Sequence, residues 1–184
     1  MPKLSPYLLS LLILFVGSFP MSFAQEEDEK PPAYEAGWNS LTFRSIGPAF
    51  TSGRIADFAV NPRNSSEFYV ATAAGGIWKT SNHGLNFEPI FDGEGSYSIG
   101  VVELDPNNPN VVWVGTGENN NQRSVAYGDG IYKSLNGGQS WEHMGLKESE
   151  HIGMIAIDPR NSDVVYVAAT GPLWSSGGDR GLYK

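Results

Sequence analysis

A pattern of short apolar segments and polar turns recurs three times along the chain. Each copy opens with about six alternating or fully apolar residues, passes through an Asx-Pro turn, and reaches an aromatic-Val pair eight residues after the Asx. A Gly-Ile/Leu-aromatic-Lys segment then closes the copy. The opening segments begin at Ile55, Ile99 and Ile152, so the offsets are 44 and 53 residues. The closing segments are Gly76–Lys79, Gly130–Lys133 and Gly181–Lys184.

Each repeat predicts four short antiparallel strands. In the second repeat we expect strands at Ile99–Leu104, Val111–Gly115 and Ile131–Ser134, and a fourth from Trp141. Two-residue periodicity and β-branched residues exclude a helical solenoid. Four strands in each 44 to 53 residues are typical of a β-propeller blade. The predicted fold is therefore an all-β propeller of antiparallel blades, with two full blades and most of a third in an incomplete ring.

The turn between the third and fourth strands has the form Ser/Thr-x-Asn-x-Gly-x-polar-aromatic in two repeats. The Asn can accept hydrogen bonds from amides of its own turn, and the Gly tolerates a positive φ. We expect the closing aromatic ring to be buried between blades. The structural residues of these turns are Thr80, Asn82, Gly84, Phe87, Ser134, Asn136, Gly138 and Trp141.

The segments before the repeats have other roles. Lys3, the apolar run Leu8–Phe19 and Ser22-Phe23-Ala24 predict a signal peptide over residues 1–24, cleaved after Ala24. An uncleaved membrane anchor is the alternative. Residues 25–37 then form an acidic linker, and the blades occupy 38–184. The divisions are a closing outer strand at 38–50, blade 1 at 51–92, blade 2 at 93–146 and partial blade 3 at 147–184. We expect a secreted or periplasmic protein with no stable membrane span after cleavage.

Composition narrows the function classes. The chain of 184 residues has no cysteine, which excludes disulfide scaffolds, thiol nucleophiles and Cys-ligated metals. Its formal net charge of -8 argues against a nucleic-acid partner, because phosphate neutralisation needs excess Lys and Arg. The three histidines, His83, His143 and His151, show no metal-ligand spacing. We therefore expect neither a metal nor a cofactor.

With the repeats in place, the chain resembles bacterial exported sortilin-N-terminal-like, BNR (Asp-box) repeat propeller proteins, often described as glycosyl hydrolase-like. The resemblance rests on Phe43–Pro48, Gly53–Asp57, Ala74–Lys79, Gly115–Asn119 and Tyr127–Ser134. In sortilins the propeller captures peptides and protein ligands, so the resemblance implies a recognition module. Both box turns carry Asn where the consensus has Asp, which argues against Ca²⁺ there.

A more distant likeness is to xyloglucanase-type glycoside hydrolases. Their first blade carries a catalytic Asp in a Thr-Asp-x-Gly-Gly segment. The corresponding stretch here is Thr72–Gly76, and Ala73 stands in the place of the acid. Because a methyl group cannot transfer a proton, this departure argues against that mechanism.

Loop lengths locate a candidate binding face. In an up-and-down blade, loop 2–3 (between strands two and three) shares one end with the connection to the next blade. Between the aligned Val and the aligned Ile or Leu, loop 2–3 spans 7, 17 and 15 residues, and such variation is commonly where binding is built. The candidate ligand-binding residues at this end are Arg54, Glu118, Asn119, Arg123, Tyr127, Trp174 and Arg180. The alternative is a solvated polar loop.

Several side chains at this end have two open interpretations. Arg54, with its equivalents Ser98 and His151, is expected at the channel mouth, where it either contacts an anion or pairs with Asp57. Trp174 is either an exposed platform or buried under its loop. The other two histidines, His83 and His143, are expected to be exposed.

The sequence thus favours an exported propeller module that binds a protein, peptide or glycan through the loop 2–3 face and is not catalytic in this segment. The alternative is the N-terminal part of a glycoside hydrolase, with Glu118 and Asp129 as weak catalytic candidates and most carboxylates in later blades. A structural repeat domain is a third class. Because a propeller needs about four blades to close, we expect further blades of the same chain, so that this is a fragment, or self-association.

Overall fold

A computed structural model describes residues 54–120 and 125–184, which all belong to the compact unit Ser45–Lys184. The expected signal peptide, acidic linker and closing outer strand lie outside the described residues, as does Arg123. No helix in the described part is long and apolar enough to cross a membrane.

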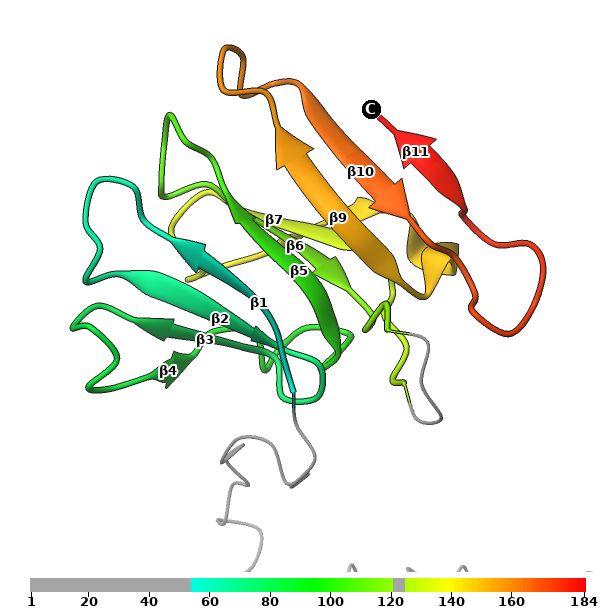
Figure 1. The fold of residues 1–184 in the computed structure, drawn as a ribbon, viewed down its shortest axis with the longest axis horizontal. Helices are drawn as coiled ribbons and strands as arrows, with labels where there is room; N and C mark the ends of the chain where they lie inside the picture. Colours follow the sequence, from blue (N-terminus) through cyan, green and yellow to red (C-terminus); the bar gives the residue numbers. More distant parts are fainter. Residues whose placement is uncertain (1–53, 121–124) are drawn as a thin grey trace, which may run out of the picture. The chain divides into compact units, whose positions relative to one another are not determined.

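The described residues form three antiparallel sheets, one for each sequence repeat (Figure 1). In the first two sheets four consecutive strands lie in chain order, and in the third β9 pairs with β10 and β10 with β11. The strands of the first sheet are β1 (Ile55–Val60), β2 (Phe68–Thr72), β3 (Ile77–Thr80) and β4 (Glu88–Pro89). Those of the second are β5 (Ile99–Leu104), β6 (Val112–Thr116), β7 (Ile131–Ser134) and β8 (Glu142–Gly145). The third contains β9 (Ile152–Ile157), β10 (Val165–Ala169) and β11 (Gly181–Tyr183), after a short 3₁₀ helix at Lys147–Ser149. This is the predicted all-β fold of propeller blades.

The Asx residue after each inner strand organises its turn in the same way. The side-chain oxygen of Asn61 accepts a hydrogen bond from the backbone N–H of Arg63 at 2.9 Å. Asp105 and Asp158 accept the equivalent bonds at 2.8 and 2.9 Å. Because the proline between the two residues cannot donate, the Asx oxygen reaches the next available amide. The repeat in sequence is thus a repeat in hydrogen bonding.

The inner strands β1, β5 and β9 lie side by side, and their sheets pack face to face (Figure 1). One core, which includes Tyr69, Ile77 and Val114, lies between the first and second sheets. A second core, which includes Trp113, Ile152 and Val167, lies between the second and third. The middle sheet is therefore covered on both faces, and every residue of β6 is buried.

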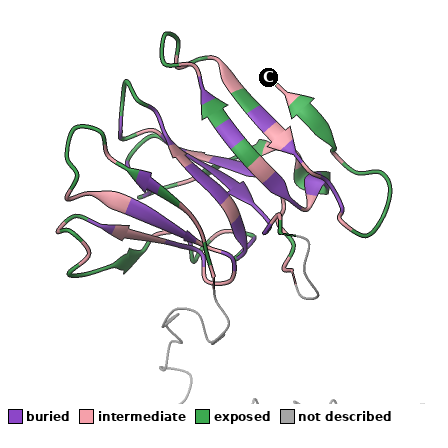
Figure 2. Ribbon diagram, in the orientation of Figure 1, coloured by how far each residue is buried: buried purple, intermediate pink, exposed green. Residues whose placement is uncertain are grey.

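The outer faces of the first and third sheets carry exposed apolar side chains. In β9 these alternate with buried residues, which face the second sheet (Figure 2). Such alternation is typical of a sheet with one covered face. The exposed side chains are Ile55, Phe58 and Val60 on β1, and Met154, Tyr166 and Leu182 on the third sheet.

The two box turns have one hydrogen-bonding pattern. The Thr80 hydroxyl oxygen accepts from the N–H of Asn82 and Gly84 at 3.3 and 3.0 Å, and Asn82 Oδ1 accepts from the N–H of Asn86 at 3.0 Å. The second turn repeats these bonds around Ser134 and Asn136. The turn is thus closed by its own side chains, as its composition predicts.

The closing aromatics of the two turns differ. Trp141 packs edge-on against Phe91, with ring centroids 5.1 Å apart, and its indole N–H donates to the carbonyl of Ile90 at 2.7 Å. It therefore fastens the second sheet to the first. The expectation of a buried ring was wrong for Phe87, which is 42% exposed and contacts Phe68 edge-on. The first sheet has no described neighbour on the side where this ring lies.

Candidate functional site

Loop 2–3 of the first and second sheets is hydrogen-bonded to the connection that leads to the next sheet, at one end of the blades. The N–H groups of Gly75 and Gly76 donate to the carbonyl of Tyr97 at 3.0 and 2.8 Å. Gly128 donates to the carbonyl of Glu150 at 2.7 Å in the second sheet. These backbone bonds hold the loops in place and build the candidate face.

Arg54, Ser98 and His151 occupy equivalent positions at the entrance to the three inner strands. Their carbonyls accept hydrogen bonds from the N–H groups of Ala73, Gly117 and Thr170, at 2.9, 2.7 and 2.9 Å. Ala73 is therefore bonded to the start of the inner strand and buried, and its methyl group offers no proton for acid–base chemistry.

Arg54 forms an ion pair with Glu118, so of its two interpretations the pairing with Asp57 is wrong. Its Nε donates to Glu118 Oε1 at 2.8 Å and its Nη2 donates to Oε2 at 2.5 Å. The Glu118 side chain is only 2% exposed, whereas that of Arg54 is 37% exposed. A bidentate pair of this kind joins the first sheet to loop 2–3 of the second. Asp57 instead accepts from the N–H of Val102 on β5 at 3.1 Å.

This geometry corrects the expectation that Glu118 lines an accessible rim, because its side chain is buried. Both carboxylate oxygens bond the guanidinium, and the backbone N–H of Glu118 donates to Ser98 Oγ at 3.0 Å. Asp129 is also occupied: Oδ2 accepts from the Tyr132 hydroxyl at 2.6 Å and Oδ1 from Thr116 Oγ1 at 3.2 Å. In this conformation both candidates have structural roles.

His151 is fully buried beneath Tyr127, with ring centroids 5.6 Å apart. Among the residues that the structure describes, neither ring nitrogen has a hydrogen-bond partner. Burial lowers the pKa of the imidazole, against the weaker opposing influence of Glu118 and Glu150. His83 and His143 are exposed, as the sequence predicts.

Two further candidates hold loops in place. Arg180 Nη2 donates to the carbonyls of Pro172 and Ser175, so it closes the loop that carries Trp174. Asn119 Nδ2 donates to the carbonyl of Gly153 on β9 at 3.2 Å. Both side chains therefore have a structural role in these loops.

Among residues 54–120 and 125–184, three aromatic side chains are exposed at this end. Trp174 is 60% exposed, which settles its two interpretations in favour of the exposed one, and Tyr127 is 57% exposed. Tyr97, which is 60% exposed, was missed by sequence reasoning. Its position next to Ser98, in the connection assigned to the same end, is the signal that could have found it.

An acidic pair on the inner strands was also missed. Burial raises the pKa of Glu103 on β5, and the nearby charge of Asp57 on β1 raises it further. The alternation along β5 could have predicted which face of the strand carries Glu103. It could not have predicted that Asp57, on another sheet, lies nearby. Within the described residues, no group of three or more His, Asp or Glu side chains is arranged to hold a metal ion.

No protein-family profile and no curated protein sequence matches the chain. Solved structures do. A GH74 enzyme of Niastella koreensis is 28% identical with a TM-score of 0.52, over 68% of this chain and 19% of that enzyme. An ancestral GH74 enzyme is 24% identical with a TM-score of 0.53, over 62% of this chain and 16% of the enzyme. A GH74 xyloglucanase of Xanthomonas campestris has a TM-score of 0.45 and 17% identity, over 66% of this chain and 21% of that one. The chain therefore spans about a fifth or less of the length of these enzymes. It shares a propeller fold with the two GH74 enzymes whose TM-scores exceed 0.5.

Proposed function

We propose that the chain is an exported propeller module that binds a glycan at its loop 2–3 end, and that the described segment is not itself catalytic. The observation that carries the proposal is the group of exposed aromatics Tyr97, Tyr127 and Trp174 at that end. Aromatic faces stack against the C–H faces of sugar rings, and a group of exposed rings on one surface is typical of a ligand-binding site.

The loops that present these rings are pre-organised. Tyr97 and Tyr127 accept backbone or hydroxyl hydrogen bonds through their carbonyls, from Gly75 and Gly76 and from Ser96. Arg180 braces the loop of Trp174. A pre-organised platform loses little entropy when it binds, so affinity is retained.

The likeness to GH74 enzymes favours a glycan over the other ligands that the sequence allows. A protein or peptide ligand, which the sortilin-like resemblance implies, is an outcome of the same test. Export rests on the segment before the repeats. The remaining blades of a longer chain, or a second copy, would cover the exposed apolar faces.

A glycan array and a peptide pull-down, both with the full chain, test the proposal. We expect Tyr127→Ala and Trp174→Ala each to weaken capture about threefold to tenfold, because each removes one stacking surface. Phe87→Ala is the matched control: it removes an exposed ring at the opposite end and should leave capture unchanged. Equal capture by all three variants would contradict the proposed face. Capture of peptides but of no glycan would show that the ligand is a peptide.

The second candidate is the N-terminal part of a glycoside hydrolase, favoured by the GH74 likeness. Because Glu118 and Asp129 are both occupied, the carboxylates would come mainly from later blades. Turnover of a chromogenic glycoside that survives in a folded Glu118→Gln variant would exclude Glu118 as the acid. Loss of turnover with unchanged stability would contradict its structural role.

A further inference from the structure

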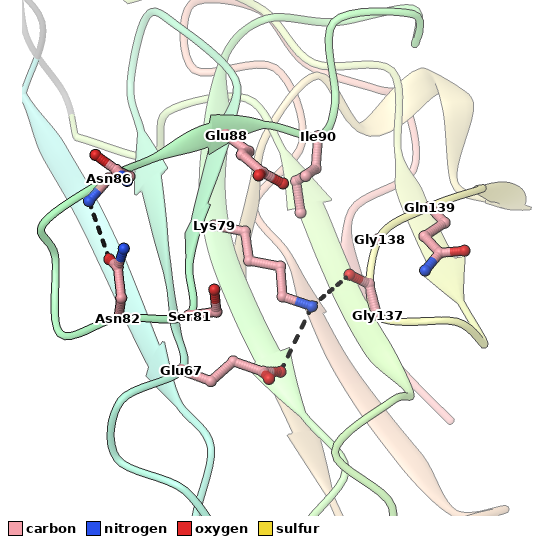
Figure 3. A pocket seen from close by; sticks show the side chains of 10 residues that line it. All are labelled: Glu67, Lys79, Ser81, Asn82, Asn86, Glu88, Ile90, Gly137, Gly138 and Gln139. Carbon is pink, nitrogen blue, oxygen red and sulfur yellow. Dashed lines mark hydrogen bonds and ion pairs between the residues drawn. The ribbon is translucent and has the colours of Figure 1, made fainter.

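A cavity lies between the first and second sheets, at the box-turn end, away from the exposed aromatics. It has a volume of about 430 Å³, within the range of small-ligand sites. Its walls are the β3–β4 hairpin of the first sheet and the turn Gly137–Gln139 of the second (Figure 3). Both of these sheets have all four strands, so the cavity does not depend on an open flank.

Lys79 is held at the centre of this cavity. Its Nζ lies 5.2 Å from the centroid of the Tyr69 ring, 3.5 Å from Glu67 Oε1 and 3.2 Å from the carbonyl oxygen of Gly137 (Figure 3). The lysine over an aromatic recurs in the other sheets as Lys133 over Trp113 and Lys184 over Tyr166. The contact between lysine and an aromatic ring is therefore a common feature of the three sheets.

Glu67 is what distinguishes the first repeat. The residues at the same place in the second and third repeats are Val111 and Val164. The cavity therefore has an ion pair where the other repeats have an apolar side chain. The fold does not require a charged residue at this position, because the other two repeats have valine there.

The charges of the lining decide the class of ligand. Glu67 and Glu88 supply two negative charges and Lys79 one positive charge. An anion would meet a net negative wall, and a metal ion would meet the central ammonium group. A neutral ligand avoids both penalties.

The lining offers donors and acceptors on both sides. The Glu88 carboxylate and the side-chain amides of Asn86 and Gln139 make no hydrogen bond to any other described residue, and all three are exposed to the cavity. Ile90 adds an apolar patch beside them (Figure 3). Hydroxyl groups can donate to the carboxylate and accept from the amides and the ammonium. We propose that this cavity is a binding site for a neutral, polyhydroxylated ligand the size of a sugar ring.

Amide chemical shifts of the full chain, titrated with glucose, xylose and glucuronate, test the site. We expect glucose or xylose to shift the amides of Gly137, Gly138 and Gln139, and glucuronate to bind more weakly. Glu88→Ala and Gln139→Ala should each weaken the sugar about fivefold, because each removes about one hydrogen bond. Glu142→Ala is the matched control, since Glu142 faces Lys133 across β7 and β8 as Glu88 faces Lys79 across β3 and β4.

Three results would overturn the site: no shift of these amides with either neutral sugar, tighter binding of glucuronate, or equal weakening by Glu142→Ala. The test is independent of the proposed function. A Tyr127→Ala, Trp174→Ala double variant should keep the shifts at Gly137–Gln139 even where it loses capture of a glycan.

Discussion

Arg54 and Glu118 are 64 positions apart in the sequence, and their side chains form a two-point ion pair between the first and second sheets. Glu118 is buried and Arg54 is partly exposed, so the guanidinium covers the carboxylate from the solvent side. The pair therefore joins the first sheet to loop 2–3 of the second sheet at this end.

Removing one partner of the Arg54–Glu118 ion pair should lower the free energy of unfolding more than removing both partners. We expect Arg54→Met to lower the urea midpoint clearly, because it leaves a buried carboxylate without its counter-charge. The Arg54→Met, Glu118→Leu double variant should recover part of that loss. A double-mutant cycle in urea measures the coupling, and additive single effects would show that the pair does not couple.

Trp141→Ala should destabilise the chain by about 2–4 kcal/mol, since it removes a partly buried ring and a hydrogen bond between sheets. The matched control is Phe87→Ala at the equivalent turn position. Its ring is largely exposed, so the expected loss is below about 1 kcal/mol. Denaturant unfolding followed by circular dichroism gives both values. Similar losses for the two variants would mean that Trp141 does not fasten the sheets.

His151 should make folding sensitive to mild acid. Its pKa is lowered in the folded chain, so the unfolded state binds the proton more readily. The contribution of neutral His151 to the free energy of unfolding is therefore fully present above the unfolded pKa of about 6.5. It is lost as the pH falls from there toward the lowered pKa of the folded state. Glu118, Glu150 and Tyr127 are the titratable groups that face the ring, and Arg54 is the charge behind Glu118.

The measurement is the urea midpoint at about pH 7.5 and about pH 5.5. We expect His151→Phe to reduce the difference between them, while His83→Asn and His143→Asn, at exposed positions, leave it unchanged. An undiminished difference in His151→Phe would assign the acid sensitivity to other groups. Asp158 is not among them, because Arg160 holds its pKa at about 2.

Arg180→Ala should loosen the loop that presents Trp174. Without the guanidinium, the carbonyls of Pro172 and Ser175 lose their shared donor. We expect faster limited proteolysis between residues 172 and 179, with little change in the global unfolding midpoint. Unchanged cleavage would show that the loop is held by other contacts, such as the hydrogen bonds between Asp179 and Glu148.

The strands were predictable because their signals are local. Ile99–Leu104 and Ile131–Ser134 match β5 and β7, and the other two strands of that sheet begin one residue later than expected. The pairing of Arg54 with Glu118 and the burial of His151 could not be predicted from the sequence, because both depend on how neighbouring sheets pack. The exposure of Trp174 depends on the conformation of its loop, where Arg180 makes hydrogen bonds that no periodicity reveals.

Within residues 54–120 and 125–184, each sheet is built from consecutive strands, and the two hydrophobic cores lie between neighbouring sheets. Structures of this kind gain stability from nearest neighbours, one unit at a time. The middle sheet has two neighbours among the described residues and each flanking sheet has one. Unfolding should therefore begin at β1–β4 and β9–β11, and the amides of β6 should be the last to exchange with solvent.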